Sequence, residues 1–287
     1  MIAHFKISHL PISVESESRR FLHDFCNIFH YFKVARPNLD LNNCISFRVS
    51  IDHTSTIACG SDVIYRSSDY RYILEYLEYK IYTLLIDRLS NYYLIHAGVV
   101  ALNDKAIVLP ASSGGGKTTL IAGLIKNGFR YLTDEIGVID PHTLEVYPFL
   151  KPLNMKIGSL PLFDNFEPEM ELIDENEMSI EDKIHHVFVK SASVQTINKP
   201  VAVGKIVFVQ YSPNEKSTLT PISRATAIFE MAKCSFNQFR FKDEGIAILD
   251  RLARGCECYE LKFNQVGDAV NLLRSHLKTP SSARWLC

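Results

Sequence analysis

Apolar and polar positions alternate at two places in the first third of the chain, at residues 2–8 and 44–52. An alternation with a period of two puts the apolar side chains on one face of an extended chain, so both stretches are predicted to be β-strands. Residues 16–32 and 70–89 instead repeat their apolar positions every three or four residues, which is typical of a helix with one buried face. The pattern therefore predicts a smaller α+β region over residues 1–91, in which no chemical motif is visible.

In the rest of the chain, short apolar runs are separated by glycine-rich and helical segments. Residues 92–102 predict a strand that turns at residues 96–98, and residues 105–111 predict a short buried strand. The loop PASSGGGKTTL follows and opens a helix that Gly128 ends. Residues 129–140 predict one further strand. Strand, glycine loop, helix and strand together form a compact α/β unit.

The α/β pattern continues to residue 277, which predicts a second domain over residues 92–277. Residues 157–182 interrupt it with an acidic, irregular sequence that we interpret as an excursion or a lid. Residues 278–287 are polar and have no periodic apolar face, which predicts a flexible tail. Further strands are expected at residues 141–149, 204–212 and 256–263, and further helices at residues 221–239, 245–255 and 265–277.

Composition argues against several classes of protein. The 287 residues carry a formal net charge of −1, which gives no global attraction to nucleic acid or to a membrane surface. We see no apolar run of signal-peptide length at the start and no segment apolar for long enough to span a bilayer. The seven cysteines include no C-x-x-C pair, and we interpret them as reduced thiols. We therefore expect a cytoplasmic protein with no nucleic-acid partner and no membrane partner.

The stretch PASSGGGKTTL has the composition of a phosphate-binding loop. Its three glycines permit the backbone angles that aim several N–H groups at one point, and the helix behind it adds the positive end of its dipole. Its lysine supplies a cation for the β- and γ-phosphates of ATP, and the next threonine supplies a hydroxyl for Mg²⁺. Ala111 stands where the usual pattern has its first glycine, at a position that opens the loop and does not touch phosphate. The residues expected to bind ATP are Ser112, Ser113, Gly114, Gly115, Gly116, Lys117, Thr118 and Thr119.

Two acidic residues, Asp134 and Glu135, follow one helix later, at the end of the next strand. The text YLTDE is similar to the Walker B motif of ABC transporters, but that interpretation needs a long insertion and a signature helix, and only one helix fits in the interval. We therefore assign the acidic pair to the strand directly after the helix. His96 ends the strand before the loop, where it is either a structural histidine or is brought beside the loop by neighbouring strands.

Together, HAGVVALNDKAIVLPASSGGGKTTL and GFRYLTDE resemble the HPr kinase/phosphorylase family and its PEP-carboxykinase-like relatives. That family carries a histidine followed by a small residue, then G-x-S-G-x-G-K-[ST], a short helix and an Asp-Asp pair. The matching positions here are His96-Ala97, residues 113–118 and Asp134-Glu135, and LTPISRATAIFEM resembles a late segment of HPr-kinase-related proteins. The resemblance covers residues 92–245. It implies a P-loop core of the PEP-carboxykinase/HPr-kinase type with a mixed sheet, and a homo-oligomer.

The resemblance also implies an activity, the ATP-dependent phosphorylation of a serine-type hydroxyl. Lys117 would then hold the β- and γ-phosphates, and Thr118 and Glu135 would hold Mg²⁺. Asp134 would accept the proton of the attacking hydroxyl, as the catalytic aspartate of the family does. His96 would orient or tune Asp134.

Two features depart from the family pattern. The second acid is a glutamate, and PLNMKIGSLPLF stands where HPr-directed enzymes carry a signature of the E-I-R-G-L-G type. These departures favour a divergent relative that acts on a hydroxyl of another peptide, protein or small molecule, such as the kinases that modify lasso-peptide precursors. Lys156 and Arg224 are candidates for a second cation on the transferred phosphate, or are ordinary surface charges.

Two other functions use the same residues. A P-loop ATPase would use water as the nucleophile, and the missing N-K-x-D motif argues against GTP as its substrate. A nucleotide-sensing module would bind ATP without transferring phosphate, while residues 1–91 recruit a partner. An acceptor that becomes phosphorylated distinguishes the kinase from both.

Overall fold

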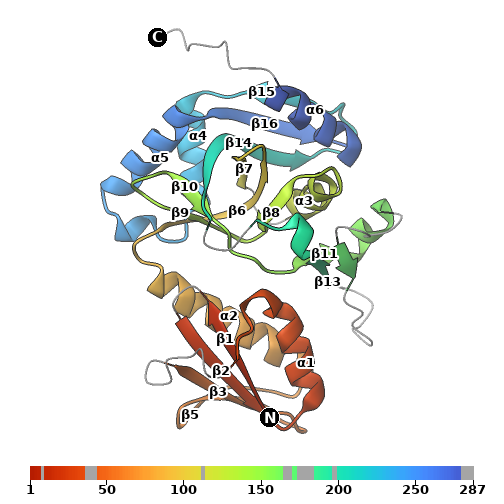
Figure 1. The fold of residues 1–287 in the computed structure, drawn as a ribbon, viewed down its shortest axis with the longest axis vertical. Coiled ribbons are helices and arrows are strands. Elements are labelled where there is room, and N and C mark those ends of the chain that lie inside the picture. Colours follow the sequence, from red (N-terminus) through yellow and green to blue (C-terminus); the bar gives the residue numbers. More distant parts are fainter. Residues whose placement is uncertain are drawn as a thin grey trace. The chain divides into compact units, whose positions relative to one another are not determined.

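The computed structural model describes residues 1–7, 10–35, 44–110, 114–163, 170–172, 184–195 and 199–278. These residues fall into two compact units, one within Met1–Ser90 and one that begins at Asn91 (Figure 1). Each unit combines helices with a β-sheet, so the described part of the chain is a mixed α/β protein.

The first unit contains a five-stranded sheet. Its strands lie in the order β1 (Ile2–Ile7), β2 (Leu10–Ser16), β3 (Ile45–Ser50), β4 (Ser55–Cys59) and β5 (Asp62–Ser67). β2 and β3 are parallel, and the other neighbours are antiparallel. Strands β1 and β3 confirm the predicted alternation. Strands β2, β4 and β5 are not among the predicted strands, and Ser16 and Ser55 are buried at the end of β2 and the start of β4.

Helix α1 (Arg19–Ile28) begins at Ser18, whose hydroxyl accepts a hydrogen bond from the Phe21 N–H at 3.2 Å. This cap satisfies one of the N–H groups that have no partner within the helix. The chain then turns into the short 3-10 helix η1 (His30–Phe32), so the helix predicted over residues 16–32 is shorter at both ends. The buried face of α1 consists of Phe21, Leu22, Phe25 and Ile28.

Helix α2 (Tyr70–Arg88) confirms the helix predicted over residues 70–89. Its cap is Asp69, which accepts a hydrogen bond from the Arg71 N–H at 2.9 Å and pairs with the Arg71 guanidinium. Its buried residues recur every four positions and pack against β4 and β5; they are Ile73, Leu77, Ile81 and Leu85.

The cap of α2 is expected to stabilise the first unit. Asp69→Ala removes the acceptor and is expected to lower the free energy of unfolding by about 1 kcal/mol. The hydrogen bond from Arg71 lowers the pKa of Asp69, so the contribution of its charge is present above the ordinary carboxyl pKa and is lost as pH falls through the lowered pKa of the folded state. Asp69→Asn keeps an acceptor oxygen and serves as the control. Urea denaturation at neutral and acidic pH checks this. If the free energies of unfolding of wild type and Asp69→Asn do not become equal in acid, the prediction is contradicted.

An eight-stranded sheet forms the centre of the second unit. Its strands lie in the order β10 (Glu145–Tyr147), β9 (Ile136–Ile139), β6 (Tyr93–Leu102), β7 (Lys105–Pro110), β14 (Val201–Tyr211), β16 (Glu257–Phe263) and β15 (Thr218–Pro221), and β8 (Arg130–Thr133) also pairs with β6. β7, β14 and β16 are parallel, whereas β6 is antiparallel to β7, β8 and β9. The sheet is therefore mixed.

Strand β6 runs unbroken from Tyr93 to Leu102, so the turn expected at residues 96–98 is wrong. The strand changes its partner there instead, because its first half pairs with β9 and its second half pairs with β8. The single strand expected over residues 129–140 is wrong for the same reason. It divides into β8 and β9, and Asp134 and Glu135 lie in the break between them.

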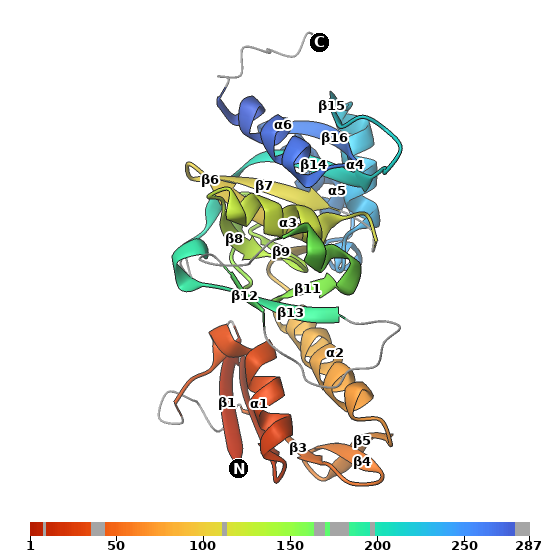
Figure 2. The ribbon, with the colours of Figure 1, turned by 90° about the vertical axis from the view of Figure 1, so that its right-hand side faces the viewer.

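Helices cover both faces of the eight-stranded sheet (Figures 1 and 2). They are α3 (Lys117–Lys126), α4 (Arg224–Lys233), α5 (Glu244–Gly255) and α6 (Val266–Lys278). α4 and α5 pack in one cluster with alternate residues of β6, among them Ala97. Gly98, the next residue, faces α3, because successive side chains of a strand point to opposite faces. α3 and α6 contact each other on this second face.

A three-stranded antiparallel sheet completes the second unit. Its strands lie in the order β11 (Leu153–Lys156), β13 (Ile184–Val189) and β12 (Met170–Leu172), and the 3-10 helix η4 (Ile157–Leu162) follows β11. Short 3-10 helices also occur at η5 (Ser191–Ser193) and η6 (Gln238–Arg240). Much of the expected lid, and residues 279–287 of the expected tail, lie outside the described residues. No helix in the described ranges is long and apolar enough to cross a bilayer.

The close approach of α3 to β6 depends on Gly98. A Cβ atom at that position would lie 2.1 Å from Cδ1 of Ile121 and 3.3 Å from Cγ of Lys117. We expect Gly98→Ala to lower the free energy of unfolding by about 1–3 kcal/mol, as overpacking does. Gly267→Ala is the matched control, because a Cβ there meets no atom within 4 Å and alanine favours a helix. Urea denaturation of both variants checks this, and equal stabilities would contradict it.

Candidate functional site

The glycine loop leads from strand β7 into helix α3. Gly114 and Gly116 have positive φ angles of 89° and 84°, which residues with a Cβ rarely adopt. Gly116 precedes the helix, and a Cβ there would lie 2.9 Å from Cζ of Phe263. Glycine is thus required at Gly116 by its backbone angle and by its neighbour. Residues 111–113 lie outside the described residues, so the opening of the loop at Ala111 and the binding of phosphate by Ser112 and Ser113 stay predictions.

Three neighbouring strands bring the loop and the acidic pair together. β6 lies between β7 and β8 and is antiparallel to both, so β7 and β8 run in the same direction. Pro110, the last residue of β7, pairs with Ala97, and Thr133, the last residue of β8, pairs with Val99. Both strands therefore end at nearly the same level of β6.

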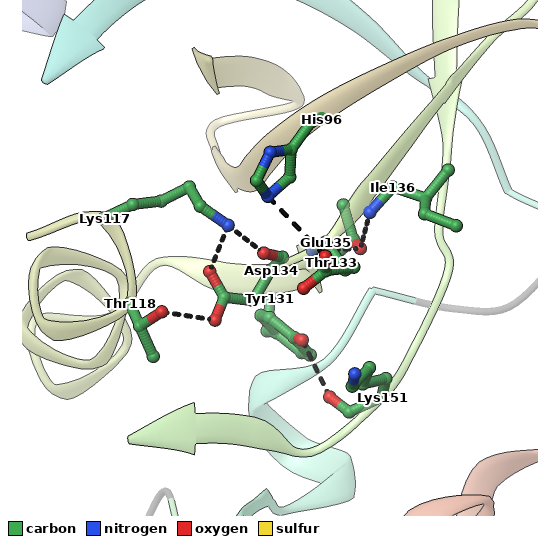
Figure 3. Close-up of polar contacts among 9 residues, drawn as sticks. All are labelled: His96, Lys117, Thr118, Tyr131, Thr133, Asp134, Glu135, Ile136 and Lys151. Carbon is green, nitrogen blue, oxygen red and sulfur yellow. Dashed lines mark hydrogen bonds and ion pairs between the residues drawn. The ribbon is translucent and has the colours of Figure 1, made fainter. Parts of the chain in front are cut away.

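Lys117 is 8% exposed, and its ammonium faces Asp134 (Figure 3). Its Nζ lies 3.1 Å from Oδ1 of Asp134 and also donates to the main-chain carbonyl of Asp134. The hydroxyl of Thr118 donates to Oδ2 of Asp134 at 2.7 Å. Two side chains from the first turn of α3 therefore hold both oxygens of one carboxylate at the end of β8.

His96 contacts Glu135 and not Asp134, which differs from the expected contact. Its Nε2 lies 3.6 Å from Oε1 of Glu135, and the two side chains are 27% and 37% exposed. The reason is the pairing of β6, because the Ala97 N–H donates to the carbonyl of Glu135 at 3.3 Å and so fixes that backbone beside His96. The hydroxyl of Thr133 accepts from the N–H groups of Glu135 and Ile136 and stabilises the break between β8 and β9 (Figure 3).

Burial shifts the pKa values of Asp134 and His96 in opposite directions. It raises the pKa of Asp134, against the opposing effects of the Lys117 ammonium and the Thr118 hydroxyl. It lowers the pKa of His96, and the charge of Lys117 adds to this effect, while Glu135 and Asp134 oppose it. His96 is therefore neutral at neutral pH. It contacts Glu135 as an uncharged imidazole and adds no further positive charge to the site.

The donor atoms at this site are oxygens, from the Thr118 hydroxyl and the carboxylates of Asp134 and Glu135. Mg²⁺ prefers oxygen ligands and is often held by one or two protein groups together with substrate phosphates and water. The residues present thus fit Mg²⁺ bound together with a nucleotide. In the described part of the chain, no group of three or more His, Cys, Asp or Glu side chains is arranged to hold a metal ion.

The structure brings only some of the other predicted residues near the start of α3. The hydroxyl of Thr119 donates to that of Ser159 at 2.8 Å, which ties α3 to η4 beside the loop. Lys156 is exposed at the end of β11, which packs against α3. Arg224 begins α4 and pairs with Asp250 at 3.3 Å, on the face of the sheet away from α3. The structure therefore does not bring Arg224 to the loop.

The surroundings of the loop include two aromatic residues that the sequence does not single out. The N–H of Tyr211, the last residue of β14, donates to the carbonyl of Gly115 at 3.1 Å. The ring of Phe263, the last residue of β16, lies beside Gly116. No local signal marks either residue, since only the pairing of β7 with β14 and of β14 with β16 brings them to the loop.

Comparisons with known proteins do not identify the function of this chain. No family model matches the chain, and no curated protein matches it. Among solved structures, it is similar to that of the Hpr(Ser) kinase/phosphatase from Coxiella burnetii, with 11% sequence identity and a TM-score of 0.31. The match covers 64% of this chain and 90% of that one. A likeness of this extent supports no conclusion about activity.

The buried pair of Lys117 and Asp134 is expected to stabilise the fold. Lys117→Met leaves a buried carboxylate without its counter-charge and is expected to lower the free energy of unfolding by about 3–5 kcal/mol at neutral pH. Adding Asp134→Asn removes that charge, so the double variant should be more stable than Lys117→Met alone. Urea denaturation of the two single variants and the double variant checks this. Additive effects of the two substitutions would contradict the pairing.

Proposed function

We propose that this chain is a P-loop kinase that transfers the γ-phosphate of ATP to a serine-type hydroxyl of a peptide, a protein or a small molecule. The observation that carries the proposal is the contact of Lys117 and Thr118 with Asp134. A cation and a hydroxyl at the start of a helix, next to a glycine loop, are the groups that bind a polyphosphate. A carboxylate within reach of both supplies the acid–base group that transfer to a hydroxyl requires.

In this proposal the first turn of α3 binds the phosphates. Its N–H groups have no partners within the helix, and Gly114 and Gly116 leave room for close approach. The ammonium of Lys117 contacts Asp134, and the β- and γ-phosphates would compete for it. Binding of ATP would then release Oδ1 of Asp134 for the acceptor hydroxyl. In this proposal the carboxylate and the phosphates thus share one cation, Lys117.

Asp134 would accept the proton of the attacking hydroxyl. Its pKa is raised by burial, and a carboxylate with a raised pKa is a stronger base near neutral pH. Glu135 and Thr118 would hold Mg²⁺, which neutralises charge on the phosphates. His96, neutral and within 3.6 Å of Glu135, would then orient that glutamate and not Asp134. In the same proposal the unit within Met1–Ser90 serves in recognition of the acceptor.

The test is phosphate transfer from ATP in the presence of Mg²⁺ to a panel of peptides, amino acids and other small hydroxyl compounds, read by mass spectrometry. Wild type is expected to give a product heavier by one phosphate. Asp134→Asn should reduce the transfer rate by about 10²–10⁴-fold, the usual contribution of a general base. Asp104→Asn is the matched control, because that carboxylate is exposed and pairs with Arg130 at 2.7 Å.

Other outcomes would replace the proposal. Release of inorganic phosphate without a labelled acceptor would indicate an ATPase. Binding of ATP with neither transfer nor hydrolysis would indicate a nucleotide-sensing module. An Asp134→Asn variant as active as wild type would remove the base role from Asp134.

A further inference from the structure

Tyr211 lies beside the glycine loop without taking part in the chemistry assigned above. β14 is the parallel neighbour of β7, and the carboxyl ends of both strands reach the loop. The N–H of Tyr211 donates to the carbonyl of Gly115 at 3.1 Å. Its Cβ lies 3.1 Å from the place that a Cβ at Gly116 would take. The side chain of Tyr211 therefore starts within van der Waals reach of the phosphate loop.

The ring of Tyr211 is supported on one side and open on another. Tyr211 is 50% exposed, whereas Phe263 is 2% exposed. The two ring centroids are 5.6 Å apart, with an angle of 63° between the planes, so the edge of one ring packs on the other. A large aromatic surface held at a fixed orientation, and half open to solvent, is the form of a stacking platform.

The order of the strands indicates which part of a nucleotide would lie there. The γ-phosphate must face Asp134 and Glu135, which follow β8, and β8 lies beyond β6 on one side of β7. The nucleoside end of an extended nucleotide therefore points to the other side of β7. That side is the end of β14, where Tyr211 stands. Ligands of sheets with parallel strands are bound across such carboxyl ends.

We propose that the ring of Tyr211 stacks on the base of the bound nucleotide, and that the site accordingly favours purine over pyrimidine nucleoside triphosphates. This inference rests on the proposed nucleotide site and adds the subsite for the base. A purine offers two fused rings to the tyrosine face, so it gains more contact than a pyrimidine does. The backbone of Tyr211 anchors Gly115 and the side chain binds the base, so the two contributions are separable by substitution.

Calorimetric titration with ATP and with inorganic tripolyphosphate, both with Mg²⁺, tests the subsite. Tyr211→Ala keeps the N–H that binds Gly115 but removes the ring. It is expected to weaken ATP binding by about ten-fold, the effect typical of one lost base stack, and to leave tripolyphosphate binding unchanged. Tyr211→Trp should bind ATP as tightly as wild type does. Phe229→Ala is the matched control, because Phe229 is a 64% exposed aromatic residue on α4.

Each contrary result points to a different failure. If Tyr211→Ala binds ATP as tightly as wild type, or weakens tripolyphosphate binding equally, the stacking role is wrong. If CTP and UTP bind wild type as tightly as ATP and GTP do, the preference for purines is wrong. If wild type binds tripolyphosphate but Tyr211→Ala changes nothing for ATP, the phosphate site stands and only the subsite for the base fails. If wild type binds neither ligand, the proposed function itself fails.

Discussion

A lysine ammonium almost wholly withdrawn from water needs a carboxylate beside it, and in this chain that requirement links the start of helix α3 to the end of strand β8. Lys117 and Asp134 lie far enough apart in sequence that only the sheet between them can bring them together. Strand β6 does this because it pairs with the strands that precede both residues. The break after Thr133 and the position of Glu135 beside His96 both follow from these pairings.

The same arrangement separates two tasks that a phosphate site must combine. Under the proposed function, the groups that would bind phosphate come from one helix turn, whose geometry is set by the local backbone. The acidic groups come from a strand end, whose geometry is set by pairing with β6. Because Lys117 contacts Asp134, a ligand that attracts the Lys117 ammonium would change the surroundings of Asp134 as well. In the proposed function, phosphate binding and acid–base chemistry would therefore be coupled through the Lys117 side chain.

Local signals in the sequence predict the positive φ angles of the glycines and the helix that follows them, but not the residues that lie around them in space. The glycines, Lys117 and the helix behind them are predictable because backbone freedom and helix capping act over a few residues. The continuity of β6 is not predictable, because Gly98 usually marks a turn, whereas here its missing side chain makes room for Ile121. The partner of His96 and the place of Tyr211 depend on strand order, which one sequence does not reveal.

The alternation of β6 also restricts how this sheet can assemble. His96 and Gly98 share one face of the strand, and Ala97 belongs to the other. A slip of one residue in pairing would turn the methyl group of Ala97 into the space that Ile121 occupies and would carry the imidazole into the apolar cluster under α4 and α5. Misregistered sheets are thus penalised on both faces at once. The residues that shape the site therefore also disfavour an incorrect register of β6 during folding.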